Sequence, residues 1–575
     1  MDALRNSEIK RKYFIGFLIL WVAQMAAALY FCVQKQGFHE DELYTYYSTA
    51  RTNGFYVENG KWMDRETYRN EFVVLPNERF QYGLVKQVQS WDVHPPMYYW
   101  VFHTVASLVP GVFSKWIGLS VNLFFHGINL CLLARLTYLV SKKDWTITLL
   151  VNLVYGFSPA AMSGVVFIRM YEMLTTFVLL CAIWHVRAAQ EGARRLPVKI
   201  LLAMAAVTYF GFLTQYYYFI FLFFLAGAFC LWLLWRDRKI GNCLRYVLAQ
   251  GLAFCLAYLT YPAFPGQMFR GQRGAQATQN FFDFSNTFER IGFFWNLMNG
   301  YVFGYLLFII LLVVAVLAVR VRRQEASVTG QKEKGDAIGR AGDAGQDMIE
   351  NEPRFGLAFW MLLFTAAGYF IAVSKTALLL GNTSNRYQLP IYGIVVLLLL
   401  YACKTLWRQV VALFGVRRVT GGFVGFLVKR RKVTEKAAFA FCLAVIASGY
   451  LFAEVVFLYP TAKEERALAR EQAAKGIPVV YVYKPGEEWC IWAVADVLME
   501  YERVYFVAAD SEGPITEPAI VNADALVAYL SRDDWESGGG PLERFAASCA
   551  LGARHQYHHP YCESCYYFMT EAGRP

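Results

Sequence analysis

Long apolar runs, separated by short polar and basic segments, recur along most of this chain. The first covers residues 13–33, and later ones lie near residues 115–140, 145–158, 173–185, 200–235, 246–264, 301–319, 355–373, 391–401 and 437–458. A helix needs about 20 apolar residues to cross the hydrocarbon core of a bilayer. The pattern therefore predicts a mostly α-helical, polytopic transmembrane bundle.

Two of the apolar runs depart from the length of a single span. Residues 200–235 carry no charge and are too long for one helix, so we expect a turn at Thr214-Gln215-Tyr216-Tyr217-Tyr218. Residues 97–110 are too short to cross, and counting them as a span would place the basic turn at 141–144 on the outer side. We interpret 97–110 as an interfacial or re-entrant helix, which leaves about eleven spans.

Lysine and arginine residues gather in alternate inter-run segments, which is typical of cytoplasmic loops. The basic N-terminal arm and the blocks within 187–199, 236–239 and 417–432 place the N-terminus in the cytoplasm. On the same side, the charged, glycine-rich stretch 320–354 is expected to be a disordered loop. The first loop (34–96), a further loop at 265–299 and the whole tail are then extracytoplasmic.

The tail has a different pattern from the membrane part. Short runs of β-branched and aromatic residues at 477–483, 503–508 and 525–531 predict strands, and 489–501 predicts a helix. Strand–helix–strand at this spacing indicates a small α/β layer. We therefore expect a transmembrane domain over residues 1–458 and an extracytoplasmic α/β domain over 459–575.

Composition supports the membrane assignment and narrows the possible partners. The 575 residues are 57% hydrophobic and 17% charged, with a mean hydropathy of +0.32. The net charge of +11 does not indicate nucleic-acid binding, because the basic residues form short blocks between apolar runs. Cys562 and Cys565, after a His-rich stretch, favour a disulfide or redox pair over zinc, and whether they form a disulfide stays open. We expect no metal and no cofactor.

A carboxylate pair, Asp41-Glu42, lies just beyond the first apolar run. A carboxylate near apolar surface has a raised pKa, which suits it to take a proton from a hydroxyl group. We interpret Asp41 as a general base and Glu42 as a second acid that tunes it. The alternative, in which Asp41 caps a helix beginning at Glu42, fits the two residues equally well. Their place at the outer membrane face favours catalysis.

A second polar stretch, Asp92-Val93-His94-Pro95-Pro96, precedes the short apolar run. Two prolines disfavour helix at His94 and suit the first turn of a helix near Met97. We expect Asp92 and His94 on a rigid elbow, where they contact substrate. The alternative is a helix cap with a solvated histidine, and it fits Asp92 better than His94.

Basic and aromatic side chains also lie at the outer ends of the predicted spans. They are Arg169, Tyr171, Tyr216, Tyr217, Lys375, Arg386 and Tyr387. Basic residues there oppose the inside bias, and a phosphate ligand would account for them because a guanidinium binds phosphate bidentately. Snorkelling to lipid headgroups is the alternative. We favour phosphate binding for Arg386 and leave Lys375 open. The tyrosines suit either sugar stacking or interfacial anchoring.

Five motifs occur in a fixed order on the outer face. After the acid pair come His94-Pro95-Pro96-Met97-Tyr98-Tyr99, Arg169-Met170-Tyr171, Thr214-Gln215-Tyr216-Tyr217 and Arg386-Tyr387-Gln388-Leu389-Pro390. The ordered set, within residues 1–458, resembles the GT-C glycosyltransferases. Among them it is most similar to bacterial relatives of protein O-mannosyltransferases and lipid A aminoarabinosyltransferases.

The resemblance implies an inverting glycosyltransferase of the plasma membrane. Such an enzyme moves a sugar from a polyprenyl-phosphate-linked donor to an extracytoplasmic protein, lipid or glycan acceptor. Asp41 corresponds to the base, and Arg386, with Arg169, would stabilise the phosphate leaving group. The alternative is a transporter or flippase of lipid-linked glycans, for which charges at mid-span and inverted repeats would be expected. The sugar, the acceptor and the lipid length stay open.

Overall fold

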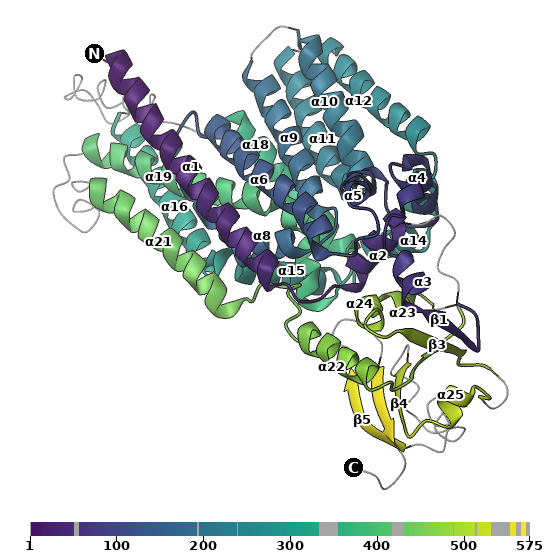
Figure 1. Cartoon of the computed structure of the whole chain (residues 1–575). Helices are drawn as coiled ribbons and strands as arrows, with labels where there is room; N and C mark the ends of the chain where they lie inside the picture. Colours follow the sequence, from purple (N-terminus) through teal and green to yellow (C-terminus); the bar gives the residue numbers. More distant parts are fainter. Residues whose placement is uncertain are drawn as a thin grey trace. The chain divides into compact units, whose positions relative to one another are not determined.

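The structure, a computed structural model, consists mainly of helices with one mixed β-sheet (Figure 1). It describes residues 2–50, 57–191, 195–237, 240–332, 355–416, 431–486, 488–511, 515–530, 552–558 and 565–570. The chain forms two compact units. The helical unit comprises residues 1–29, 123–165 and 170–456, and the α/β unit comprises residues 30–122, 166–169 and 457–575.

The helical unit contains the apolar helices that the hydrophobic runs predict, together with helices that they do not predict. In order they are α7 (Trp145–Gly156), α8 (Pro159–Val166), α9 (Tyr171–Gln190), α10 (Val198–Thr214), α11 (Tyr217–Asp237), α12 (Gly241–Thr260), α13 (Phe264–Phe269), α14 (Gln272–Phe282), α15 (Thr287–Phe303), α16 (Leu307–Lys332), α18 (Leu357–Thr376), α19 (Leu389–Val416) and α21 (Arg431–Phe452). A 3-10 helix, η2 (Gly381–Tyr387), precedes α19. Helices α1 (Asp2–Gln34) and α6 (Lys115–Val140) contribute residues to both units.

Within the described ranges, seven helices are long and apolar enough to cross a membrane: α1, α6, α9, α11, α12, α18 and α19. Two further candidates are bent pairs, α7 with α8 at 59° and α15 with α16 at 89°. Helices α10 and α21 carry shorter apolar segments. The chain is thus an integral membrane protein. The number of spans, expected to be about eleven, stays a prediction.

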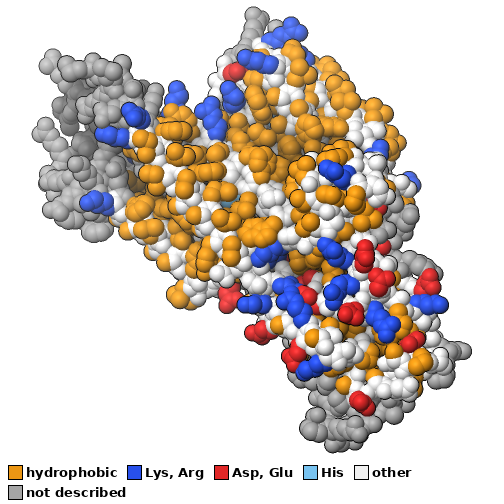
Figure 2. Space-filling model, in the orientation of Figure 1, with side chains coloured by type: hydrophobic (Ala, Val, Ile, Leu, Met, Phe, Trp, Pro, Cys, Tyr) orange, Lys and Arg blue, Asp and Glu red, His pale blue; other side chains and the backbone are white. Residues whose placement is uncertain are grey.

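The surface of the helical unit agrees with lipid contact. Figure 2 shows hydrophobic side chains over most of its visible face, with few Lys and Arg among them. Large apolar residues such as Phe223 in α11 and Leu259 in α12 are 62% and 73% exposed. So much exposed apolar surface is stable only against another apolar phase, which for these helices is the bilayer.

Two expectations for connecting segments were wrong. The stretch 265–299 was expected to be an outer loop, but it contains most of α13, α14 and most of α15. The charged stretch 320–354 was expected to be a disordered loop, yet α16 covers its first part as far as Lys332. Residues 333–354 lie outside the described residues. Both stretches are rich in residues that tolerate helix, so polarity alone did not mark the helix ends. The predicted break of 200–235 is confirmed, because α10 ends at Thr214 and α11 begins at Tyr217.

The α/β unit is built on a six-stranded sheet with strand order β1-β3-β2-β4-β6-β5. Its strands are β1 (Lys61–Asp64), β2 (Val479–Tyr483), β3 (Arg503–Ala508), β4 (Ala525–Leu530), β5 (Gly552–His558) and β6 (Cys565–Thr570). Strand β2 is fully buried and pairs parallel with both β3 and β4, while the remaining pairs are antiparallel. The three predicted strands are confirmed. The predicted helix 489–501 is instead two short helices, α23 (Trp489–Trp492) and α24 (Ala495–Leu498).

The loop at 34–96 belongs to the same compact unit as the tail. Strand β1, from that loop, pairs antiparallel with β3 of the tail. Where α1 ends, the Gln36 amide donates to the carbonyl of Leu458 (2.7 Å), and the Lys35 ammonium donates to that of Phe457 (2.7 Å). A side chain at Gly37 would lie 2.5 Å from Ala462. The expected boundary at 458/459 therefore misses that loop, which folds together with the tail.

Short helices between α1 and α6 position the predicted chemistry. They are α2 (Glu40–Ala50), α3 (Arg65–Asn70), η1 (Pro76–Glu78), α4 (Tyr82–Trp91) and α5 (Met97–Leu108). In the tail, α22 (Ala462–Ala474) precedes the sheet and α25 (Pro518–Val521) precedes β4. As expected, Pro96 stands directly before a helix of 12 residues. That α5 lies in the membrane interface stays a prediction.

Candidate active site

The acid pair lies in the first turn of α2, behind an N-cap made by His39. The His39 Nδ1 atom accepts from the Asp41 amide (3.1 Å), and the Glu42 carboxylate accepts from the His39 amide (2.6 Å). This resembles a capping box, with histidine in place of serine or threonine and its ring bonded to the second amide of the helix where a capping box uses the third. Asp41 is therefore within the first turn and is not the cap residue, which removes the structural alternative considered for it.

Glu42 is completely buried and receives three donors. Besides the His39 amide, Lys35 Nζ donates to it (2.9 Å) and the Ile168 amide donates to its other oxygen (2.7 Å). Burial raises the pKa of Glu42 against the opposing effect of Lys35, and burial lowers the pKa of Lys35. Such an enclosed carboxylate cannot reach a substrate hydroxyl. The geometry makes Glu42 a tether between α2 and the 166–169 turn.

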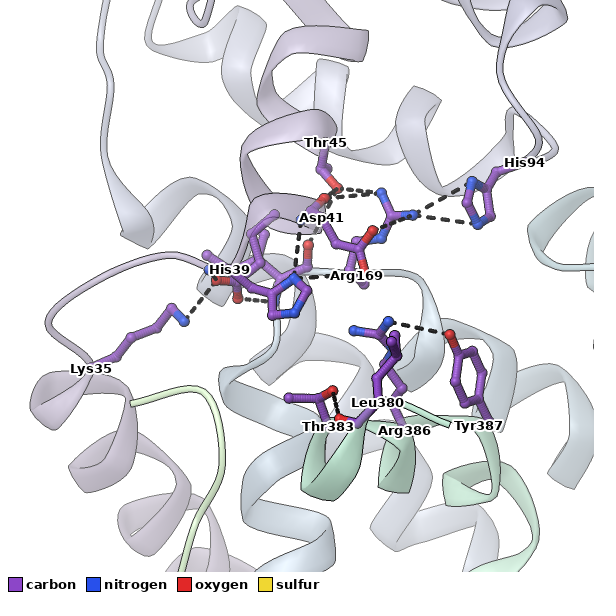
Figure 3. Close-up of polar contacts among 12 residues, drawn as sticks. Lys35, His39, Asp41, Thr45, His94, Arg169, Leu380, Thr383, Arg386 and Tyr387 are labelled. Atoms are coloured by element: carbon purple, nitrogen blue, oxygen red, sulfur yellow. Dashed lines mark hydrogen bonds and ion pairs between the residues drawn. The ribbon is translucent and has the colours of Figure 1, made fainter. Parts of the chain in front are cut away.

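Arg169 brings that turn against Asp41 (Figure 3). One guanidinium nitrogen donates to the carbonyl of Asp41 (3.1 Å), to Thr45 Oγ1 (3.1 Å) and to Tyr99 Oη (3.0 Å). The other lies 4.0 Å from the Asp41 carboxylate. Arg169 is only 4% exposed, whereas the Asp41 side chain is 24% exposed. The arginine thus faces the carboxylate, which stays accessible.

The Asp92–His94 elbow completes this cluster. The His94 ring lies 3.1 Å from the Asp92 carboxylate through Nδ1, and Arg169 lies 3.4 Å from its Nε2. Donation from Nδ1 to Asp92 and acceptance at Nε2 from the arginine satisfy both contacts. Burial raises the pKa of Asp92, but His94 and Arg169 together hold it below its usual value. Asp92, His94, Arg169 and Asp41 form one continuous polar chain.

A glycine lets the 166–169 turn approach this closely. A Cβ atom at Gly118 in α6 would lie 2.0 Å from the Ile168 side chain. Nearby, Asn122 donates through its amide nitrogen to the carbonyl of Phe167. Any larger residue at position 118 would push Ile168, and with it Arg169, away from α2.

A second group of predicted residues surrounds Arg386 in the helical unit. Arg386, in η2, is 5% exposed, lies over the Tyr387 ring at 5.0 Å, and donates to the Tyr387 hydroxyl (3.2 Å; Figure 3). The Tyr387 ring has edge contacts with Tyr171 at 6.0 Å and Tyr217 at 5.8 Å. Three helical segments thus supply tyrosines around a single buried guanidinium, which suits a fixed, partly desolvated anion site.

Two predicted ligands have structural partners. Lys375 Nζ donates to the carbonyl of Asp283, to Asn286 Oδ1 (2.9 Å) and to Thr287 Oγ1 (2.9 Å). These acceptors match the three hydrogens of an ammonium group, so the interpretation of Lys375 as a substrate ligand is not supported. Tyr216 donates to the side chain of Gln267, which ties it to α13.

Sequence reasoning missed Lys35, His39, Thr45 and Tyr99. Two of them carried a usable signal: Lys35 is a lysine directly after a span, and Thr45 lies one turn after Asp41 on the same helix face. His39 and Tyr99 were within the motifs but carried no distinguishing feature. No group of three metal-ligating side chains occurs among the described residues. Cys562, part of the cysteine pair considered above, lies outside them.

The structure is similar to solved structures of membrane glycosyltransferases. ArnT from Cupriavidus metallidurans, bound to undecaprenyl phosphate, is 11% identical with a TM-score of 0.48, and its apo state gives 0.46; each covers 96% of this chain and 98% of ArnT. The oligosaccharyltransferase AglB from Archaeoglobus fulgidus, in complex with an inhibitory peptide and a dolichol-phosphate, is 11% identical with a TM-score of 0.39, over 95% of this chain and 74% of AglB. No protein-family model and no curated protein matches the sequence. At these scores the assignment of chemistry rests on the residues themselves.

Proposed function

We propose that this protein is an integral-membrane inverting glycosyltransferase that uses a polyprenyl-phosphate-linked sugar and an extracytoplasmic acceptor. One observation carries the proposal: the two adjacent acids differ completely in environment. Glu42 is buried with three donors, while Asp41 is accessible and faces a guanidinium. A base that acts on an exogenous hydroxyl must be reachable by it, and of the two acids only Asp41 is.

In the proposed reaction, Asp41 takes the proton of the acceptor hydroxyl as its oxygen attacks the anomeric carbon. The new carbon–oxygen bond forms as the bond to the lipid phosphate breaks, and the phosphate leaves as an anion. Because phosphate is a good leaving group, one carboxylate is sufficient, unlike the pair that a glycosidase requires. Arg169, itself held by His94, orients Asp41.

We propose that the residues around Arg386 bind the lipid-linked sugar donor. A buried guanidinium flanked by tyrosines supplies charge to the phosphate and ring faces to the sugar. Tyr171, Tyr217 and Tyr387 are the proposed lining. Loss of one such donor typically costs about 3 kcal/mol of transition-state stabilisation.

Orientation is part of the proposal. The N-terminus is assigned to the cytoplasm from the inside bias of the basic blocks, and the tail to the outer face. A cysteine introduced at Lys475, whose side chain is 60% exposed in the tail, should react with a membrane-impermeant maleimide in intact cells. Reaction only after lysis would reverse the orientation.

Transfer from radiolabelled polyprenyl-phosphate sugars, by membranes containing the protein, tests the function. Asp41→Asn keeps the shape but cannot accept a proton at neutral pH, so transfer should fall by at least a hundredfold with unchanged thermal stability. Arg386→Ala should raise KM and lower kcat together, because it loses contact with the phosphate before and during transfer. Arg386→Lys should recover only part of this loss. Full transfer by Asp41→Asn would end the proposal.

A further inference from the structure

A cavity of about 440 Å³ opens in the α/β unit, and Lys35, which bonds Glu42, is part of its wall. Four cationic side chains line it, Lys35, Arg69, Lys115 and Arg466, beside the acids Asp496 and Glu500. Figure 2 shows Lys and Arg side chains interspersed with Asp and Glu on the visible face of this unit. None of these residues has a role in the transfer reaction proposed above.

The acids in this cavity already have basic partners. Asp496 pairs with Arg466 at 3.0 Å. Glu500 pairs with Arg470 through two hydrogen bonds of 2.7 and 2.8 Å. Each carboxylate is thus bonded to an arginine other than Arg69.

Arg69 and Lys115 make different contacts. Arg69 donates to the carbonyl of Gly111, and Lys115 donates to those of Val33 (3.0 Å) and Lys35. Among the residues that the structure describes, neither of the two has a carboxylate partner. Main-chain carbonyls orient these side chains toward the cavity without cancelling their charge, so the wall carries an excess of positive charge.

The cavity lies where two candidate spans end. The span in α1 ends at Gln34, one residue before Lys35, and the span in α6 begins at Lys115. Trp116, which follows Lys115 and lies under its ammonium at 5.5 Å, is 41% exposed. Exposed tryptophan beside lysine at the end of a span is typical of the headgroup layer of a bilayer. The cations therefore face the level of lipid phosphates.

We propose that this cavity binds the phosphate of an anionic phospholipid headgroup. The Arg69 fork and the Lys115 ammonium contact the phosphate oxygens, since guanidinium suits bidentate phosphate contacts. The Phe38 and Phe113 rings, 5.4 Å apart, form the apolar part of the lining, against which the glycerol backbone packs. The excess positive charge selects a net anionic headgroup over a zwitterionic one.

Native mass spectrometry of the full-length protein in detergent, titrated with phosphatidylglycerol or phosphatidylcholine, tests this site. Phosphatidylglycerol should be retained more tightly. Arg69→Gln and Lys115→Gln should each weaken it about fivefold, the equivalent of ~1 kcal/mol per basic side chain near an anionic surface. Arg79→Gln is the matched control, because Arg79 belongs to the same outer loop, is exposed, bonds one carbonyl and does not line the cavity.

Unchanged retention in both variants, or equal retention of the two lipids, would overturn the site. Displacement of the lipid by millimolar inorganic phosphate would show that the cavity binds a soluble phosphate, and would overturn the proposal of a lipid ligand. Should Lys115→Gln fail to fold, Lys115→Arg keeps the charge and should retain lipid, while Arg69→Gln, at an exposed position, still decides. Transfer activity of Arg69→Gln reports separately on the glycosyltransferase proposal.

Discussion

Replacing Lys35 by methionine tests how the acid pair is held. Lys35 and Glu42 are both fully buried and 2.9 Å apart. Methionine has a similar length and volume but carries no charge, so it leaves Glu42 with only the His39 and Ile168 amides as donors. Breaking a buried pair by removing one partner typically costs about 3–5 kcal/mol, because the remaining charge is enclosed without compensation.

The cost should depend on pH. Burial raises the pKa of Glu42, and Lys35 opposes that rise, so loss of Lys35 raises it further. The folded variant then binds a proton more tightly than the unfolded chain does, and its unfolding free energy falls as pH increases. We expect the destabilisation relative to wild type to be larger at pH 8 than at pH 5.

Chemical denaturation of the detergent-solubilised protein, followed by tryptophan fluorescence, measures the effect. The double variant Lys35→Met/Glu42→Gln removes both charges and should be more stable than the two single effects predict, with a coupling of about 2 kcal/mol. Lys475→Met is the matched control, since its pair with Glu471 is 60% exposed on both sides, and it should leave the midpoint unchanged. Wild-type stability of Lys35→Met at pH 8 would refute the reasoning.

Three further changes probe other parts of the molecule. Trp492→Ala removes the ring stacked on Tyr47 of α2 at 4.2 Å and should lower kcat. Trp492→Phe keeps an aromatic ring and should restore kcat. If both variants have the kcat of the wild type, the tail does not hold α2. Asp144→Asn should destabilise the protein at neutral pH. Burial raises the pKa of Asp144, but the hydrogen bond and the charge of Lys404 outweigh it and lower that pKa. The thermal unfolding midpoints of variant and wild type should therefore converge as pH falls below about 4. Lys375→Met should lower the midpoint but leave the KM for the lipid donor unchanged, and a raised KM would restore Lys375 as a phosphate ligand.

The sequence predicted most of the secondary structure because that information is local. Apolar length marked the membrane helices, Thr214 and Tyr217 marked the break between α10 and α11, and β-branched runs marked β2, β3 and β4. Helix ends that lie in polar stretches were harder to predict from the sequence. Helix α16 continues to Lys332 through charged residues that are good helix formers.

The pairing of strands far apart in the chain could not be predicted from the pattern of hydrophobic and polar residues. Strand β1 is four residues long and pairs with β3, which is more than 430 residues away along the chain. Nothing in its local sequence indicates that partner, and the first outer loop was therefore assigned to the membrane domain. The same reason hid the bond from Lys35 to Phe457 and the approach of Ile168 to Gly118.

The acid pair shows how helix geometry separates two adjacent residues of similar chemistry. Successive positions on a helix point about 100° apart, so Asp41 and Glu42 cannot both face the same site. Glu42 occupies the position from which a side chain reaches back to the N-cap amide, and its second oxygen meets the Ile168 amide. Aspartate at position 42 would be one methylene too short to make both bonds, although it has the same charge. Glu42→Asp should therefore release the 166–169 turn and impair transfer through Arg169, while the base itself is untouched; transfer and stability equal to wild type would show that the tether is dispensable.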